Sequence, residues 1–134
     1  MASMATLPQD FRDRTARPKK VLVIDDDRSI RELLSLHLAN RGYDVAVAED
    51  AVVGGRLALS VKPQLIIIDV NMPYLDGPDF VAALKSDPQT KDIPVVFLTS
   101  DEDFHDRAGR LGAVAYLTKP VLADRLLDVV ARAI

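Results

Sequence analysis

The stretch from Leu65 to Gly77, LIIIDVNMPYLDG, constrains the fold of this chain more than any other. Its first four residues are apolar and mostly β-branched, which is typical of a strand buried on both faces of a parallel sheet. Asp69 ends that strand, and the pairs Met72-Pro73 and Asp76-Gly77 predict a loop after it. Because ligands of open α/β sheets bind outside the carboxyl ends of the strands, Asp69 is a candidate functional residue.

Strand and helix patterns alternate along the rest of the chain. The expected strands are 20–24, 43–48, 64–68, 93–98 and 113–117, and the expected helices are 28–40, 51–61, 78–86, 103–111 and 123–133. Asp27 and Asp50 are placed to cap the first two helices, and Gly42 and Gly112 to end the first and the fourth. The alternation predicts an α/β fold with one five-stranded parallel sheet and five helices on both of its faces.

Composition restricts the class of protein. The chain has 134 residues, of which 49% are hydrophobic and 28% charged, as expected for one soluble globular domain. It has no cysteine, which excludes disulfides and thiolate metal sites. No apolar run is long enough to span a bilayer or to form the core of a signal peptide. We therefore expect a cytoplasmic protein without membrane contact.

The net charge of -3 is unevenly distributed. The first 20 residues contain five basic and two acidic residues, whereas the remainder contains 12 basic and 18 acidic ones. Residues 1–18 have two prolines and no clear period, so we expect a disordered basic arm, whose first three residues look like an expression scar. The acidic remainder, residues 21–134, argues against direct nucleic-acid binding by the folded domain.

Polar side chains follow four of the predicted strands: Asp25-Asp26-Asp27, Asp69, Thr99 and Lys119. The carboxyl ends of parallel strands lie along one edge of a sheet, so these groups should meet. Clustered carboxylates repel one another, and a hard cation such as Mg²⁺ relieves that repulsion. A hydroxyl and an ammonium opposite them are what a phosphoryl group needs, and aspartate is a known covalent nucleophile. The sequence therefore predicts a site where phosphate joins a carboxylate.

Four segments then carry a family resemblance: VLVIDDD (21–27), IIIDVNMPYLDG (66–77), PVVFLTS (94–100) and AYLTKP (115–120). Together they resemble the receiver domain of two-component response regulators, over about residues 19–134. The resemblance implies a flavodoxin-like, doubly wound (βα)5 fold. It also implies a phosphorylation-dependent signalling switch that catalyses only its own phosphotransfer and dephosphorylation, rather than an enzyme.

By this resemblance Asp69 is the phosphoacceptor. The implied magnesium ligands are Asp26, which binds directly, Asp25, which binds partly through water, Asp69 itself and the main-chain carbonyl of Asn71. The implied phosphoryl donor is a phosphohistidine on a sensor histidine kinase or a histidine phosphotransfer protein.

The resemblance also assigns the residues that read the phosphate. Thr99 and Lys119 would contact the phosphoryl oxygens, Thr99 and Tyr116 would form the switch, and the bond from Lys119 to Pro120 would be cis. The surface that changes would be formed by the fourth helix, fifth strand and last helix. Its partner would be a downstream protein target, an output domain or a second copy of the chain.

Three other functions remain open from the residues. A haloacid-dehalogenase-like phosphatase also uses a strand-end aspartate and magnesium, but it needs a second aspartate two residues later, where this chain has Asn71. A nucleotide- or flavin-binding domain would need a phosphate-cradling loop, and neither G-x-x-x-x-G-K-[ST] nor G-x-G-x-x-G follows a strand. A degenerate receiver with a structural role is the third. Whether the domain stands alone or was excised from a larger protein is open as well.

Overall fold

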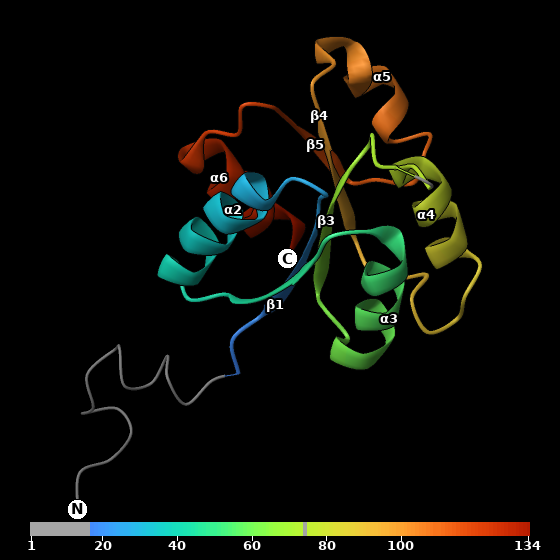
Figure 1. Ribbon diagram of the computed structural model, residues 1–134, viewed down its shortest axis with the longest axis horizontal. Helices are drawn as coiled ribbons and strands as arrows, with labels where there is room; N and C mark the ends of the chain where they lie inside the picture. The colour runs from blue at the N-terminus through green and yellow to red at the C-terminus, as the bar shows by residue number, and fades with distance from the viewer. Residues whose placement is uncertain (1–16, 74) are drawn as a thin grey trace, which may run out of the picture.

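Five parallel strands form a single sheet at the centre of the molecule (Figure 1). The structure is a computed structural model that describes residues 17–73 and 75–134. The strands are β1 Lys20–Ile24, β2 Asp44–Ala48, β3 Leu65–Asp69, β4 Val95–Thr99 and β5 Ala115–Thr118. Their order in the sheet is β2-β1-β3-β4-β5, which confirms the predicted doubly wound topology. The order reverses between β1 and β3, and ligands bind at such switch points.

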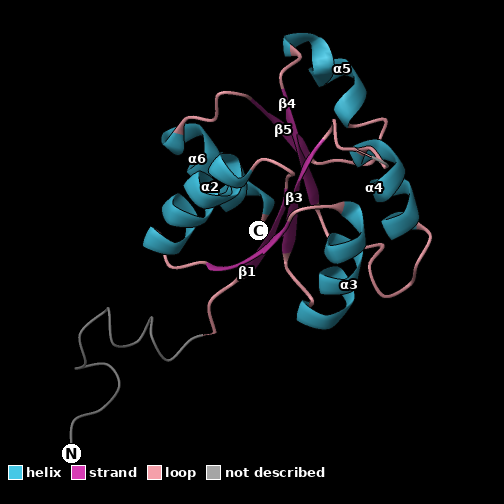
Figure 2. Ribbon diagram, in the orientation of Figure 1, coloured by secondary structure: helices cyan, strands magenta, loops and turns pink. Residues whose placement is uncertain are grey.

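Helices cover both faces of the sheet (Figure 2). They are α2 Arg28–Asn40, α3 Ala51–Val61, α4 Gly77–Lys85, α5 His105–Ala108 and α6 Ala123–Ala133, with a 3-10 helix, η2 Glu102–Phe104, before α5. Helices α2 and α6 lie on one face, and α3, α4 and α5 lie on the other (Figure 1). The four longer helices have nine or more residues, whereas α5 is a single turn of four.

Strand β3 is buried on both faces, as its sequence predicts. Leu65 and Ile67 belong to the apolar core beneath α2 and α6, and Ile66 and Ile68 belong to the core beneath α3 and α4. Asp69 is the last residue of this strand and remains buried at 5% exposure. The strand therefore delivers one carboxylate to the carboxyl edge of the sheet.

Aspartate side chains begin three of the helices. Asp27 accepts a hydrogen bond from the Ser29 amide at 2.8 Å, and Asp50 accepts one from the Val53 amide at 2.9 Å. These two caps were predicted. Asp76 caps α4 in the same way at 2.9 Å, and the sequence analysis did not assign it that role. The observed starts of α2 and α3 agree with the predicted ones because these capping bonds are local.

The predicted helix 103–111 is wrong in its length. The segment forms η2 and the single turn α5, followed by turns up to Gly112, whose φ is +91°. The apolar spacing had a real cause, because Phe104 and Ala108 are buried. Continuous helical bonding is nevertheless absent from this segment, and Gly109, a poor helix former, follows α5 directly.

The predicted boundaries of four strands also shift, and β3 runs from Leu65 to Asp69 instead of over 64–68. The Tyr43 amide donates to the Leu38 carbonyl at 3.1 Å, so Tyr43 closes the end of α2 instead of starting β2. The Ile93 amide donates to Thr90 in a turn, and Pro94 has no amide hydrogen, so β4 starts at Val95. Strand β5 starts at Ala115.

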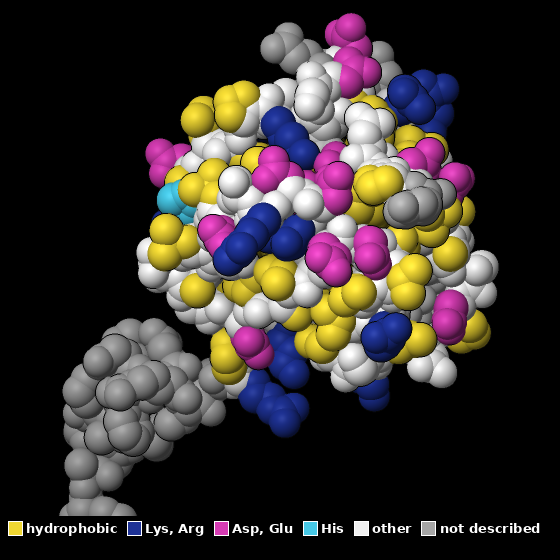
Figure 3. Space-filling model, viewed as in Figure 1, with side chains coloured by type: hydrophobic (Ala, Val, Ile, Leu, Met, Phe, Trp, Pro, Cys, Tyr) yellow, Lys and Arg dark blue, Asp and Glu magenta, His cyan; other side chains and the backbone are white. Residues whose placement is uncertain are grey.

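The predicted arm, residues 1–18, lies outside the described residues apart from Arg17 and Pro18, which have no regular secondary structure. Acidic side chains are spread over the face drawn in Figure 3, and several basic ones gather at its lower edge, where the described chain begins. Arg17, Lys19 and Lys20 are exposed there. None of the helices in the described part of the chain is long and apolar enough to cross a membrane.

The adjacent glycines of α3 provide a test of this packing. A Cβ atom on Gly54 would lie 2.6 Å from the Cδ1 atom of the fully buried Ile24, whereas one on Gly55 would lie 3.7 Å from Phe80, an ordinary contact. We expect Gly54→Ala to lower the free energy of unfolding by about 1–3 kcal/mol through overpacking. Gly55→Ala should raise it by up to about 1 kcal/mol, because alanine is the better helix former. Urea unfolding measures both, and a Gly54→Ala variant as stable as the wild type would contradict the close approach of α3 to β1.

Candidate functional site

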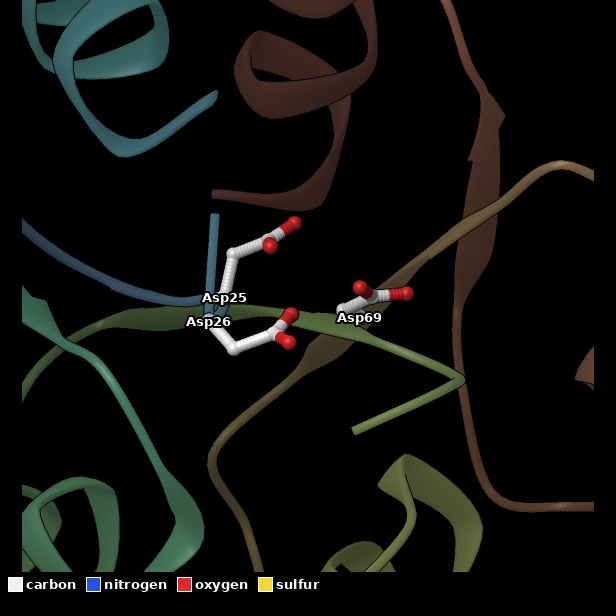
Figure 4. Close-up of side chains that lie close together, drawn as sticks. All are labelled: Asp25, Asp26 and Asp69. Carbon is white, nitrogen blue, oxygen red and sulfur yellow. The ribbon is translucent and has the colours of Figure 1, made fainter. Parts of the chain in front are cut away.

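Three carboxylates converge at the carboxyl edge of the sheet (Figure 4). Asp25 and Asp26 directly follow β1, and Asp69 ends the neighbouring strand β3. Each offers an oxygen, and these oxygens all lie within 4.8 Å of one another. Asp25 is fully buried, whereas Asp26 is exposed, so the cluster has a closed side and a side that faces solvent.

Lys119 bridges the two buried carboxylates. Its Nζ atom donates a hydrogen bond to Asp69 Oδ2 at 3.0 Å and forms an ion pair with Asp25 Oδ2, also at 3.0 Å. Its own amide donates to the Thr99 carbonyl at 2.7 Å, which ties the end of β5 to the end of β4. The bond from Lys119 to Pro120 is cis, as the family resemblance implies.

The electrostatic state of the cluster reflects burial and pairing. Burial raises the pKa of Asp25 above its ordinary value, and the nearby Asp69 charge adds to that effect. The Asp27 amide, which donates to Asp25 Oδ1 at 2.8 Å, and the Lys119 ammonium offset it only in part. Burial alone would lower the pKa of Lys119, but its hydrogen bond to Asp69 and its close ion pair with Asp25 outweigh burial and raise it.

The loop after β3 is packed tightly against the site. The Asn71 amide donates to Asp69 Oδ1 at 3.1 Å, so each oxygen of the Asp69 carboxylate has a partner. The Gly77 amide donates to the Val70 carbonyl at 2.9 Å. A Cβ atom on Gly77 would lie 2.5 Å from the Asp69 carbonyl oxygen, so only glycine allows this approach. The sequence predicts a loop here, but not the contact that requires the glycine.

Thr99 lies at the end of β4, the neighbour of β3, and is 1% exposed. Its Oγ1 atom accepts a hydrogen bond from the Asp101 amide at 3.0 Å, which leaves the hydroxyl hydrogen available for donation. Tyr116 lies in β5 opposite Phe97 of β4 and is half-buried against the core that includes Phe104. Tyr116 lines a surface hollow with Ala108 and Gly109, so it lies beside the end of α5 rather than in the carboxylate cluster.

The cluster fits a hard divalent cation. Asp25 Oδ2 is buried, and Lys119 Nζ lies 3.0 Å from it in an ion pair that lacks hydrogen-bond geometry. Such an unsatisfied carboxylate oxygen, beside two further carboxylates, offers the oxygen ligands that Mg²⁺ prefers. Asn71 lies in the adjoining loop and is exposed. The predicted site residues Asp25, Asp26, Asp69 and Lys119 thus come together, with Thr99 on the next strand.

One further contact to this site was not predicted. Arg31 of α2 donates a hydrogen bond from Nη1 to the main-chain carbonyl of Asp25 at 2.7 Å. Arg31 lies on α2, six residues after Asp25, and nothing in the sequence pattern predicts that its side chain turns back to the end of β1.

The buried charge of Asp25 should make the protein less stable than it could be. Because the surroundings of Asp25 favour its neutral form, Asp25→Asn should raise the free energy of unfolding in Mg²⁺-free buffer at neutral pH. Asp44→Asn is the matched control, since Asp44 is exposed at the opposite edge of the sheet, and it should change little. Urea unfolding gives both values, and a destabilised Asp25→Asn protein would mean that the ion pair with Lys119 outweighs the cost of burial.

Comparison with known proteins places the chain in a family. The family model of the response regulator receiver domain matches residues 21–131. The chain is 39% identical over 110 residues to the DNA-binding dual master transcriptional regulator RpaA of Synechocystis, covering 81% of this chain and 46% of that protein. It is 38% identical over 112 residues to the response regulator MprA of Mycobacterium sp. strain KMS, covering 82% and 48%. The chain thus spans about half the length of these curated relatives.

Solved structures agree with this assignment. The chemotaxis response regulator CheY4 of Vibrio cholerae superposes with a TM-score of 0.83 at 33% identity, over 88% of this chain and 100% of that one. The receiver domain of the Francisella response regulator 1452 gives 0.78 at 32% identity, over 86% and 95%. The family match decides against the phosphatase and the nucleotide-binding alternatives. The chain belongs to the response regulator receiver domains, the phosphoacceptor switches of two-component signalling.

Proposed function

We propose that this domain accepts a phosphoryl group on Asp69 and so switches a surface that a partner reads. The observation that carries the proposal is the placement of the Asp69 carboxylate, which ends β3 with Lys119 Nζ 3.0 Å from one oxygen and two further carboxylates beside it. The donor is a phosphohistidine on a sensor histidine kinase or a histidine phosphotransfer protein.

The transfer needs little from the protein beyond position and charge. An oxygen of Asp69 forms the new P–O bond as the P–N bond of the phosphohistidine breaks. The donor imidazole keeps that electron pair and takes up a proton. Lys119 and the Thr99 hydroxyl donate hydrogen bonds to the phosphoryl oxygens, which carry the negative charge. Later, attack by water releases inorganic phosphate and regenerates the Asp69 carboxylate.

Magnesium belongs to this proposal through the residues that fit it. Asp25, Asp26, Asp69 and the Asn71 carbonyl would hold the ion. When bound, Mg²⁺ supplies positive charge that offsets the carboxylates and the incoming phosphoryl oxygens. The chain itself supplies the buried and the exposed carboxylate, and it keeps Lys119 within reach of both Asp25 and Asp69.

The phosphate is read through Thr99. Phosphorylation adds roughly two negative charges beside its hydroxyl. If Thr99 moves toward them, its bond from the Asp101 amide is lost, and the loop before η2 is released. Tyr116, which packs against the same core as Phe104, then changes place on the neighbouring strand. This is a shift between two accessible states that phosphate binds differently.

The surface expected to change is the 103–134 face, formed by η2, α5, β5 and α6. It combines the exposed Val114, at 60%, with exposed charges at Arg107, Asp124 and Arg125. Such a mixed face suits a downstream protein or a second copy of the chain. Because the DNA-binding relative is about twice as long as this chain, an output domain is a third candidate partner.

Asp69 should be the one residue that is modified. With Mg²⁺ and acetyl phosphate, intact-mass spectrometry should show a single phosphoryl addition to the wild type and none to Asp69→Asn. Chelation of Mg²⁺ with EDTA should suppress the addition. Asp101→Asn is the control for a nearby exposed carboxylate and should still be labelled. Equal labelling of Asp69→Asn would remove Asp69 as the phosphoacceptor, and an unlabelled wild type would favour the degenerate receiver.

Amide NMR tests the readout. Beryllofluoride with Mg²⁺, a mimic of the phosphoryl group, should change chemical shifts around Asp69 and across the 103–134 face. Thr99→Ala should confine the changes to the loops around Asp69, because the hydroxyl that couples the two regions is missing. If the amide chemical shifts of the wild-type 103–134 face do not change, this protein does not switch through Thr99 and Tyr116.

A further inference from the structure

Asp26 is the exposed carboxylate of the cluster, and its orientation comes from its neighbours. Across residues 17–73 and 75–134, no hydrogen bond or ion pair involves its side chain or its backbone. An exposed residue whose side chain and backbone have no partners would sample several side-chain rotamers and several backbone angles. The direction of this carboxylate toward Asp69 therefore depends on how firmly the chain is held on either side.

Both neighbours of Asp26 are fixed. On one side the Asp25 amide donates to the Ala48 carbonyl of β2 at 3.1 Å, which continues the sheet. On the other side the Asp27 amide donates to the Asp25 carboxylate at 2.8 Å, and Asp27 caps α2 through Ser29. Asp26 is thus the middle residue of a short bridge from β1 to α2.

Arg31 contacts a third group in this bridge, the main-chain carbonyl of Asp25. Its Nη1 atom donates at 2.7 Å to the carbonyl of Asp25. That carbonyl belongs to the planar peptide unit that joins Asp25 to Asp26, so fixing it also fixes the amide nitrogen of Asp26. The direction in which the Asp26 side chain leaves the backbone follows from that plane. A charge-assisted bond of this kind is among the stronger ones in proteins.

We infer that Arg31 is a positioning residue for the metal site, acting on Asp26 through the peptide unit between Asp25 and Asp26. The inference rests on the proposed function only in that Asp26 is taken as a magnesium ligand. Arg31 is half-buried, and within the described part of the chain it forms no hydrogen bond or ion pair with the Asp69 carboxylate. Its effect should therefore fall on metal affinity rather than on the reactivity of Asp69.

Loss of a positive charge near an acidic cluster could by itself change Mg²⁺ affinity. A variant of Arg28 separates this effect of charge from the effect of the lost hydrogen bond to the Asp25 carbonyl. Arg28 lies one turn earlier on α2, its side chain is 82% exposed, and it pairs with Glu32 at 2.9 Å. Arg28→Ala removes the same charge from the same helix without touching the strand end. Arg31→Met removes both charge and donors but keeps the apolar stem, and Arg31→Lys restores a charged donor.

The first measurement is the affinity of the unphosphorylated full chain for Mg²⁺, which an amide NMR titration provides. Arg31→Met should raise the dissociation constant roughly five- to tenfold, the equivalent of the net contribution of one ordinary hydrogen bond, because the metal-free protein loses the same contact. Arg31→Lys should recover most of the affinity, and Arg28→Ala should stay within about twofold of the wild type, as expected for an exposed ion pair. In the metal-free protein, the Asp26 amide shift should change in Arg31→Met and not in Arg28→Ala.

The second measurement is labelling by acetyl phosphate at increasing Mg²⁺. The half-saturating Mg²⁺ concentration should rise in Arg31→Met by the same factor as the dissociation constant, while the rate at saturation stays close to that of the wild type. If Arg31→Met does not fold, Arg31→Gln, whose amide is too short to make the contact, carries the same test.

Unchanged Mg²⁺ affinity in the folded Arg31 variants, or equal weakening in Arg28→Ala, would overturn the inference. A lowered rate at saturating Mg²⁺ with unchanged affinity would also overturn it, because Arg31 would then act on the reaction itself. Failure of the proposed function gives a different result: the wild type would not be labelled at Asp69, whereas Arg31→Met would still bind Mg²⁺ more weakly.

Discussion

The contact of Lys119 with Asp25 and Asp69 is the interaction on which the rest of the site depends. Two buried carboxylates repel each other, and burial raises the pKa of Asp25. One ammonium, 3.0 Å from an oxygen of each, reduces that cost enough for both to remain at the edge of the sheet. Because Lys119 follows β5 and the carboxylates follow β1 and end β3, the same contact also joins three strand ends across β4.

This arrangement leaves some carboxylate oxygens of the site without hydrogen-bond partners. In the proposed function, these oxygens are free to bind a cation. Asp25 Oδ2 is buried without a hydrogen bond, and the exposed Asp26 side chain has no hydrogen-bond or ion-pair partner among the described residues. Both groups would gain interactions when a cation arrives. Lys119 in turn would exchange carboxylate partners for phosphoryl oxygens. The incompletely paired groups thus lie at the carboxyl edge of the sheet, whereas the strands beneath, such as β3, are buried.

Local chemistry explains which elements could be predicted. The first residues of α2 and α3 were predicted because Asp27 and Asp50 cap them with bonds to amides two and three residues away. The helix expected over 103–111 failed because its apolar spacing reflects the burial of Phe104 against Phe97, at 5.4 Å between ring centres, rather than a continuous helix. Packing on β4 satisfies that pattern with a 3-10 turn and a single helical turn.

The sequence by itself determined the order of strands and helices, the strand ends that carry Asp25, Asp26, Asp69, Thr99 and Lys119, and hence the family. These features depend on local patterns and on the rule that parallel strands share one carboxyl edge. The tertiary structure alone decided which oxygens Lys119 bridges, why position 77 accepts only glycine, and that Arg31 holds the carbonyl of Asp25. Each of these is a contact of a few ångströms between separate elements, and its existence depends on how helices are seated on the sheet, which no local pattern specifies.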